Sequence, residues 1–427
     1  MSGIETDRGG FRDVLAHRNY RLLLMGQAVS GLGDWVGTFA FISAAYMLTG
    51  NATAVGGILV LRVLPPLLAA PIGGAVADRV DRRKLMIGCD LARAILIVFV
   101  PFVGIVLLYV LAFVHESVSM IFLPARDASV PTLVRDDELP EANGLMLASS
   151  FGSLPVGAAL FTGLHSASDL AGALPLVGGV FRSHPTAFAF VFDSATFLVS
   201  AAVIARMRRW RQHRAEVHLL RGIWQGARFV MSRPGLRAIA AALFICMVGG
   251  GALFSVGIAY VLHTLGASEN VFGWLAAIWG AGMAIGILGT RLRSELGRYI
   301  LFVGGVAVCG GVLLVMALLP VTWLALVLAL PFGAGFSLAV ALGLSLVQHV
   351  ATDEMRARIL GGVQGLFRVG LGVGAIGLGS LAQSLGGVSV GVGSIDGNQL
   401  AMVTAGGLVC LGAAIATRSR PAPWQEL

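Results

Sequence analysis

The chain has 427 residues, of which 57% are hydrophobic and only 12% are charged. Soluble domains carry about 25% charged residues, so a water-soluble protein of this length is excluded. The formal net charge of +8 could indicate nucleic-acid binding in a soluble protein. Here the basic residues lie between long apolar runs, and we expect no nucleic acid as a partner. The composition indicates a polytopic membrane protein.

Apolar runs long enough to cross a bilayer recur along the chain. A spanning helix needs about 20 apolar residues, and on that basis the sequence predicts an all-α protein with twelve transmembrane helices. Only a tight turn near residues 101–104 separates the third span from the fourth. The predicted spans are 20–47, 54–77, 84–103, 105–125, 141–163, 185–206, 236–262, 271–290, 299–318, 322–347, 359–384 and 399–417.

Arginine and lysine lie almost wholly in alternate loops. The exceptions are Arg182, in an intervening loop, and three arginines inside spans: Arg62, Arg93 and Arg368. Cytoplasmic loops carry an excess of these residues, so we expect both termini in the cytoplasm. A bacterial inner membrane is the expected location.

Two short patterns recur at one shared offset, about half the chain, which predicts duplicated halves with a substrate cavity between them. The matched residues are Gly50, Val55 and Gly57 with Gly266, Val271 and Gly273, and Val134, Asp137, Glu138 and Leu139 with Val350, Asp353, Glu354 and Met355. The predicted organisation is a tail (1–19), a six-helix bundle (20–206), a basic linker (207–235), a second six-helix bundle (236–417) and a tail (418–427).

The loop after the second span reads Gly74-Ala-Val-Ala-Asp78-Arg79-Val-Asp81-Arg82-Arg83-Lys84. It resembles the signature loop of the major facilitator superfamily, although Asp81 stands where that family usually has glycine. The resemblance implies a cytoplasmic gate made of Gly74, Asp78, Arg79, Arg83 and Asp127. In this gate Asp78 would contact the start of span eleven, and Arg83 would reach Asp127.

Further stretches look like the exporter branch that includes the enterobactin and macrolide efflux proteins. They are Gly33-Asp34-Trp35, Phe122-Leu-Pro124-Ala125-Arg126-Asp127 and Phe190-Val-Phe-Asp193-Ser-Ala-Thr-Phe197. The fifth span keeps Pro155 and Gly157 of the antiporter motif, which implies a kinked helix. The segment 165–185 is longer than the resemblance leads us to expect.

Ionisable residues inside spans are costly and therefore indicate function. Asp34, Glu116 and Asp193 are the candidates for proton coupling. Asp34 could carry the proton, or it could be held ionised by Arg62 or Arg368. Asp90 and Arg93 are three residues apart and can pair locally, so these four charged residues (Arg62, Arg368, Asp90 and Arg93) are candidates for substrate contact or charge pairing.

Metal and nucleotide sites are not expected. His115-Glu116 is followed by Ser119 where a zinc protease motif needs histidine. The one lysine, Lys84, follows Arg83 rather than glycine, so no phosphate-binding loop is possible. The four cysteines lie in apolar runs without paired spacing, as expected of buried small hydrophobes.

The sequence thus favours a monomeric secondary transporter without a cofactor, not an enzyme, whose partners are a small-molecule substrate, protons and membrane lipids. We expect it to export an amphipathic drug or siderophore-like metabolite as a proton antiporter, by alternating access. An importer or lipid flippase of the same fold is the first alternative. A membrane sensor or a membrane-embedded enzyme is the alternative from another class.

Overall fold

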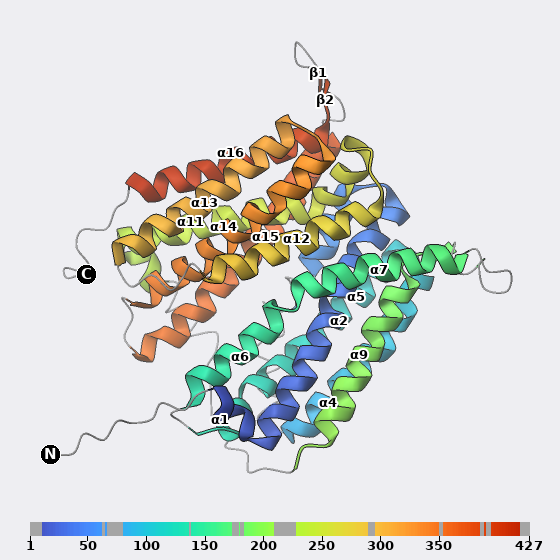
Figure 1. The fold of residues 1–427 in the computed structure, drawn as a ribbon, viewed down its shortest axis with the longest axis vertical. Helices are drawn as coiled ribbons and strands as arrows, with labels where there is room; N and C mark the ends of the chain where they lie inside the picture. Colours follow the sequence, from blue (N-terminus) through green and yellow to red (C-terminus); the bar gives the residue numbers. More distant parts are fainter. Residues whose placement is uncertain are drawn as a thin grey trace. The chain divides into compact units, whose positions relative to one another are not determined.

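A computed structural model describes residues 11–61, 65, 80–135, 138–172, 179, 183–208, 228–288, 295–349, 353–384, 388–389 and 394–418. This part of the chain is almost entirely helical (Figure 1). The α-helices are α1 (Phe11–Ala16), α2 (Arg18–Thr49), α4 (Arg82–Phe99), α5 (Ile105–Asp127), α6 (Leu139–Phe151), α7 (Leu154–Gly172), α9 (Ala187–Ala205), α11 (Pro234–Ala259), α12 (Glu269–Leu288), α13 (Glu295–Leu318), α14 (Thr322–His349), α15 (Asp353–Ser384) and α16 (Gly397–Arg418).

Shorter elements connect these helices. A helix over Ala52–Leu61 follows α2. Two 3₁₀ turns, Val100–Phe102 and Val130–Thr132, follow α4 and α5, and a π-helical turn, Tyr260–Thr264, continues α11. Strands β1 (Val388–Ser389) and β2 (Ser394–Ile395) pair antiparallel ahead of α16.

Among the described residues, ten helices are long and apolar enough to cross a membrane, judged by length and composition. They match the predicted spans except the second and the fifth. The second span is described only at residues 52–61 and 65, and the fifth is divided between two helices. The all-helical membrane fold is confirmed, while the count of twelve stays a prediction.

The fifth span breaks between α6 and α7, at Gly152 and Ser153. Pro155 follows as the second residue of α7, a position where its missing N–H costs no hydrogen bond. Helix α7 then continues to Gly172, well past the predicted end at residue 163. The first part of the unexplained 165–185 segment is therefore an extension of this helix.

The helices form two compact units. Unit 1 comprises residues 1–40, 68–103 and 110–217, and unit 2 comprises residues 41–67, 104–109 and 218–427. In unit 1, α4 packs along α9. In unit 2, α11 packs on α15, α12 on α14, and α13 on both α14 and α16.

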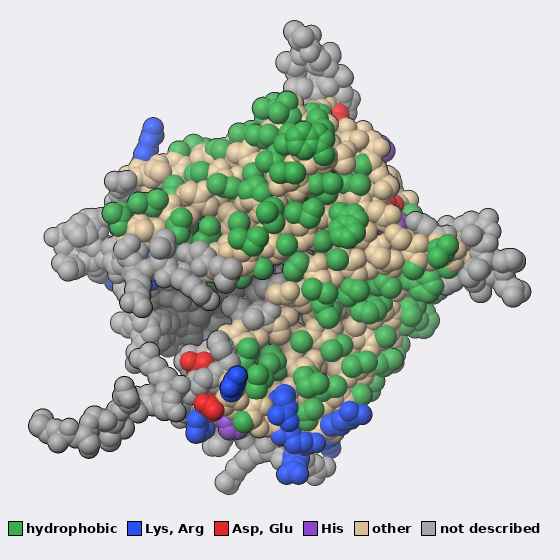
Figure 2. All heavy atoms as spheres, viewed as in Figure 1, with side chains coloured by type: hydrophobic (Ala, Val, Ile, Leu, Met, Phe, Trp, Pro, Cys, Tyr) green, Lys and Arg blue, Asp and Glu red, His purple; other side chains and the backbone are tan. Residues whose placement is uncertain are grey.

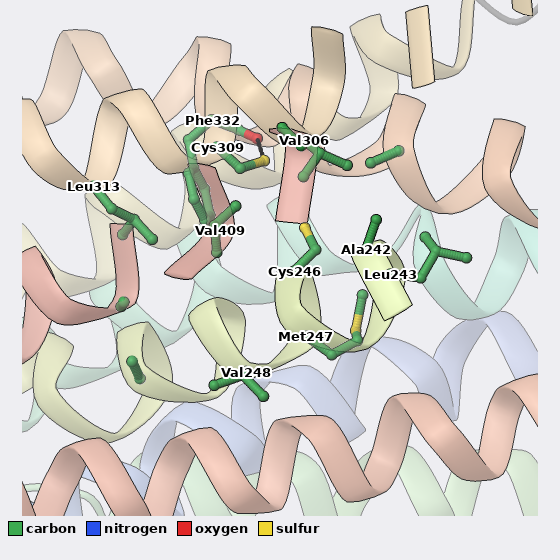
Figure 3. Packing of buried hydrophobic residues seen from close by; sticks show 14 of the residues in the cluster. Ala242, Leu243, Cys246, Met247, Val248, Val306, Cys309, Leu313, Phe332 and Val409 are labelled. Atoms are coloured by element: carbon green, nitrogen blue, oxygen red, sulfur yellow. Dashed lines mark hydrogen bonds between the residues drawn. The ribbon is translucent and has the colours of Figure 1, made fainter. Parts of the chain in front are cut away.

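Glycines let the helices of unit 2 approach closely. A Cβ on Gly251 of α11 would overlap the carbonyl oxygen of Leu371 on α15, and one on Gly333 of α14 would overlap that of Trp279 on α12. Small residues at such contacts are typical of helix packing in membranes. The apolar core of unit 2 includes buried Cys246 and Cys309, and the Cys309 Sγ donates to the carbonyl of Phe332 at 3.6 Å (Figure 3).

The backbone supports the duplication inferred from the repeated patterns. Gly50 and Gly266 both have left-handed backbone angles, with φ of 63° and 61°. Each follows the first long helix of its half, so the matched sequences mark the same turn. The α4 and α9 pairing of unit 1 also recurs as α13 and α16 in unit 2.

On the face that Figure 2 shows, hydrophobic side chains are spread over the described helices and charged side chains occupy small areas. Large hydrophobic side chains are exposed along several helices, among them Val106 at 75% and Leu170 at 76%. Lipid contact accounts for such exposure in a membrane protein. Lys84, near the start of α4, and Arg206 and Arg208, just after α9, are exposed, and Arg83 brings the two helix ends together by donating to the carbonyl of Ile204. Basic residues at this end are expected of a cytoplasmic face.

Candidate functional site

Four charged side chains from three helices lie within the spanning part of unit 1. They are Asp34 on α2, Asp90 and Arg93 on α4, and Asp193 on α9. Asp90, Arg93 and Asp193 are 0%, 3% and 1% exposed, and Asp34 is partly buried. Burying ionised groups is costly unless they are paired. We call these four residues the charge cluster.

Arg93 is held by two polar partners and two aromatic rings. Its guanidinium donates to Asp90 Oδ1 and, at 3.4 Å, to the hydroxyl of Ser119. The Phe122 and Phe197 rings flank it, with centroids 4.5 and 4.2 Å from Cζ. Two cation–π contacts and an ion pair compensate for the lost hydration of the cation. The pair has the geometry expected from its spacing, and its role in transport stays a prediction.

Asp193 occupies a groove on α2 that exists because two residues there lack side chains. A Cβ on Gly37 would overlap the Asp193 carboxylate, and one on Gly33 would lie 2.6 Å from Asp193 Oδ1. A Cβ on Gly33 would also overlap the hydroxyl of Thr196. Two of the exporter-like stretches, residues 33–35 and 190–197, therefore pack against each other. Gly33, with nearby Gly37, leaves room for the side chains of Asp193 and Thr196.

Asp34 lies on α2 between Gly33 and Gly37, the two glycines that make room for Asp193. Its charge is close enough to Asp90 for the two carboxylates to interact, and the Ser200 hydroxyl also faces Asp90. The next residue, Trp35, donates its indole N–H to the carbonyl of Ser150 at 3.0 Å, one residue before α6 ends. The cluster thus joins α2, α4 and α9, and Trp35 connects it to the broken fifth span.

The remaining proton and charge candidates lie in different places. Glu116 is on α5 and is partly buried, one residue after His115, whose ring centroid is 5.6 Å from that of Phe197. Arg368 lies on α15 in unit 2. Arg62, Gly74, Asp78 and Arg79 lie outside the described residues, so the expected roles of these four stay predictions.

The expected contact between Arg83 and Asp127 is wrong for this structure. Arg83 donates to the carbonyls of Ile204, at 3.3 Å, and Ala205, at the end of α9. Asp127 pairs with Arg126 at 2.7 Å. The last carbonyls of a helix have no partners within the helix and carry partial negative charge, so they can accept from Arg83, while Asp127 is paired with its neighbour Arg126.

Asp81, which stands where the family usually has glycine, has a structural role. Asp81 is the N-cap of α4, and its Oδ1 accepts the backbone N–H of Lys84 at 3.0 Å. Aspartate is among the best N-cap residues. The family glycine is replaced here by a residue that starts the next helix.

Sequence reasoning missed a buried carboxylate just before α6. Glu138 is 1% exposed, and it accepts from the backbone N–H of Arg135 at 2.9 Å and pairs with its guanidinium at 2.9 Å. Nε2 of His17 lies 2.7 Å from Glu138 Oε2. The backbone hydrogen bond, followed by His17, lowers the pKa of Glu138. The only sequence signal was the place of Glu138 in the repeated pattern.

Comparisons with known proteins agree on the family. Residues 23–375 match the family model described as Major Facilitator Superfamily. The chain is 26% identical to the uncharacterized MFS-type transporter YfiS of Bacillus subtilis, with 85% of this chain and 87% of the relative covered. It is 25% identical to the multidrug efflux pump Tap of Mycolicibacterium fortuitum, with 86% and 89% covered. The putative bacilysin exporter BacE of Bacillus subtilis is 30% identical over 44% of each chain.

Solved structures show the same fold. A bacterial homolog of the human lysosomal transporter Spinster, in an inward-facing and occupied conformation, superposes with a TM-score of 0.73 at 13% identity, covering 95% of this chain and 98% of the other. The nucleoside transporter NupG superposes with a TM-score of 0.72 at 10% identity, covering 95% and 99%. The family match over most of the length, with the helical fold, identifies the chain as a multi-span transport protein that belongs to the major facilitator superfamily.

Proposed function

We propose that this protein exports small amphipathic compounds from a bacterial cell in exchange for protons. The similarity to Tap, an efflux pump, and to BacE, a putative exporter, favours export. The observation that carries the proton coupling is the charge cluster of unit 1. Three acidic side chains, Asp34, Asp90 and Asp193, lie on spanning helices there, and ionisable residues inside spans indicate function because burying their charge is costly.

We assign the proton to one carboxyl of the charge cluster. Arg93 is committed to Asp90 by its ion pair. Burying an ionised carboxylate in hydrocarbon is costly, and binding a proton removes that cost. Asp34 is the preferred carrier because it lies in the middle of the 32-residue helix α2, at a depth where water is scarce.

Proton binding and substrate binding are then linked by charge. A carboxyl that takes a proton from outside and releases it inside alters the affinity of the cavity for substrate, so the proton gradient drives export by alternating access. The one-sided arginine distribution supports cytoplasmic termini.

The test is transport by Asp34→Asn in inside-out membrane vesicles, with and without an imposed pH gradient. The variant should lose gradient-driven uptake into the vesicles and keep substrate binding and downhill exchange. Asp13→Asn, an exposed acid on α1, is the matched control and should transport normally. Full gradient-driven transport in Asp34→Asn would exclude Asp34 as the carrier. Gradient-driven movement of substrate out of the inside-out vesicles would instead indicate an importer.

A further inference from the structure

Four aromatic rings from three helices meet in unit 2. Trp279 of α12 is the centre, with Phe254 of α11 at 5.2 Å and Phe336 of α14 at 5.8 Å between ring centroids. Both of these neighbours stand edge to face with the indole, at 64° and 78°. Phe332, also on α14, completes the group at 6.0 Å. We call these four residues the aromatic box.

The polar atom of the box has no partner within the described chain. Trp279 is 6% exposed, and its buried indole Nε1–H makes no hydrogen bond in the described part of the protein. Buried tryptophans usually find an acceptor for this group, because leaving it unpaired costs free energy. A phenylalanine would keep ring contacts without that cost. The choice of tryptophan is explained if a bound molecule supplies the acceptor.

The depth of the box narrows what that molecule can be. Trp279 lies in the middle of the 20-residue α12, and Phe332 and Phe336 lie in the middle of the 28-residue α14. Lipid chains at this depth offer no acceptor, whereas transporters of this architecture bind substrates near the midplane. Phe254 and Phe336 are only partly buried, so the box keeps an accessible edge.

The box is also fixed by its backbone. Because Gly333 lacks a side chain, α14 lies directly against the carbonyl of Trp279. Phe332 and Phe336, on either side of that glycine in sequence, are thereby held against the indole. Gly250 of α11 lies beside Phe336, where an added Cβ would be 3.6 Å from its ring. Rigid aromatic walls around a single donor are typical of sites that orient a ring-bearing ligand.

We infer that the aromatic box is a binding subsite for a flat aromatic ring that carries a hydrogen-bond acceptor, with Trp279 Nε1 as the donor. The inference rests on the proposed export function and names the substrate class: aromatic amphipathic compounds with a carbonyl or similar oxygen on or beside the ring. The rings hold the apolar part of the substrate and the indole selects the acceptor.

Two probes separate the ring contacts from the hydrogen bond. Rhodamine 6G has an ester carbonyl beside its aromatic system, whereas tetraphenylphosphonium has aromatic rings and no acceptor. Binding to purified protein in lipid nanodiscs is measured by fluorescence polarisation for the first and by equilibrium dialysis of the tritiated compound for the second, with empty nanodiscs as the blank. Trp279→Phe should weaken rhodamine 6G binding about tenfold and leave tetraphenylphosphonium binding unchanged.

Further variants complete the test. Trp279→Leu, which removes the ring as well, should weaken both probes. Trp274→Phe changes a tryptophan that is 52% exposed on the same helix and should weaken neither. Equal binding of rhodamine 6G by Trp279→Phe and wild type, or an equal loss in Trp274→Phe, would overturn the subsite. Wild-type protein that binds neither probe would also overturn it, whereas the export function is decided separately by vesicle transport of other compounds.

Discussion

At the scale of single residues, Glu138 shows how one carboxylate fixes a junction. His17, between α1 and α2, and Arg135, ahead of α6, both hold it. Two further side-chain bonds lie close by: Tyr20 donates to the carbonyl of Ala142 at 2.8 Å, and Asn19 binds the backbone of Arg208 at 3.0 Å. Polar contacts therefore tie the start of α2 to α6 and to the end of α9.

The lowered pKa of Glu138 makes this junction sensitive to acid. The ionised form is favoured in the folded protein, so its stabilising contribution is fully present above the ordinary pKa of 4.5 and is lost as the pH falls through the lowered value. Glu138→Gln should therefore lower the Tm of the purified protein at pH 7. The difference from wild type should shrink below pH 4.5.

Thermal unfolding in detergent across this pH range measures the effect. Asp127→Asn, at a side chain that is 63% exposed, is the control and should leave the Tm nearly unchanged at every pH. A Glu138→Gln difference that stays constant down to the most acidic pH would show that the hydrogen bonds, and not the charge, stabilise the junction.

At the scale of elements, close helix contacts depend on glycines whose neighbours are backbone atoms. A Cβ on Gly251 would overlap the Leu371 carbonyl, which cannot move without the whole of α15. Gly251→Ala should therefore separate α11 from α15 and cost about 1–3 kcal/mol of stability, as overpacking does.

The matched control for this contact is Gly311→Ala on α13, where an added Cβ meets nothing within 4 Å. It replaces the same residue type in a helix of the same unit. A fluorescence-based thermal shift measurement should show a lower Tm for Gly251→Ala alone. Equal Tm values for the two variants would mean that the helices can separate at no cost.

Sequence reasoning located most elements because a spanning helix must be apolar along its whole length. Sequence reasoning was least accurate where a helix extends beyond its apolar residues. Helix α7 continues through His165, Ser166 and Ser168, whose polarity ended the predicted span although the helix does not need apolar residues there. Pro155 gave a sign of the kink, but the break at Gly152 and Ser153 depends on packing that no local pattern encodes.

The charge cluster was predictable only in part, for a related reason. Asp34, Asp90, Arg93 and Asp193 stood out because charge in an apolar run is costly. The fit of Asp193 between Gly33 and Gly37 brings together residues far apart in sequence. The partner of Arg83 was predicted wrongly because Arg83 binds the backbone carbonyls of Ile204 and Ala205. Every residue type has a backbone carbonyl, so the sequence gives no sign of which one is bound.

At the scale of the whole molecule, the predicted topology has a direct test. Single cysteines placed by Asp169→Cys and Asp396→Cys should react with an impermeant thiol reagent on intact cells, and Arg214→Cys should not, because alternate loops face opposite sides. A Cys410→Ser background removes the native cysteine that is only partly buried. Labelling at position 214 from outside would contradict the count of twelve spans and the cytoplasmic termini.

The expected duplication adds a constraint at the same scale. The recurring turn at Gly50 and Gly266 indicates that the two halves share a plan, yet the charge cluster lies in unit 1 and the aromatic box in unit 2. We expect this division to separate proton binding from ring recognition, so that Asp34→Asn retains affinity for rhodamine 6G while losing gradient-driven transport.

Proton movement caused by substrate decides whether the protein is an exchanger. Purified wild-type protein and Asp34→Asn are reconstituted into liposomes that contain a trapped pH-sensitive dye, and an outward substrate gradient is imposed without any initial pH gradient. Exchange predicts that substrate efflux through wild-type protein acidifies the lumen, and that Asp34→Asn exchanges labelled substrate without any change in pH. Substrate efflux through wild-type protein with no acidification of the lumen would contradict proton-coupled export.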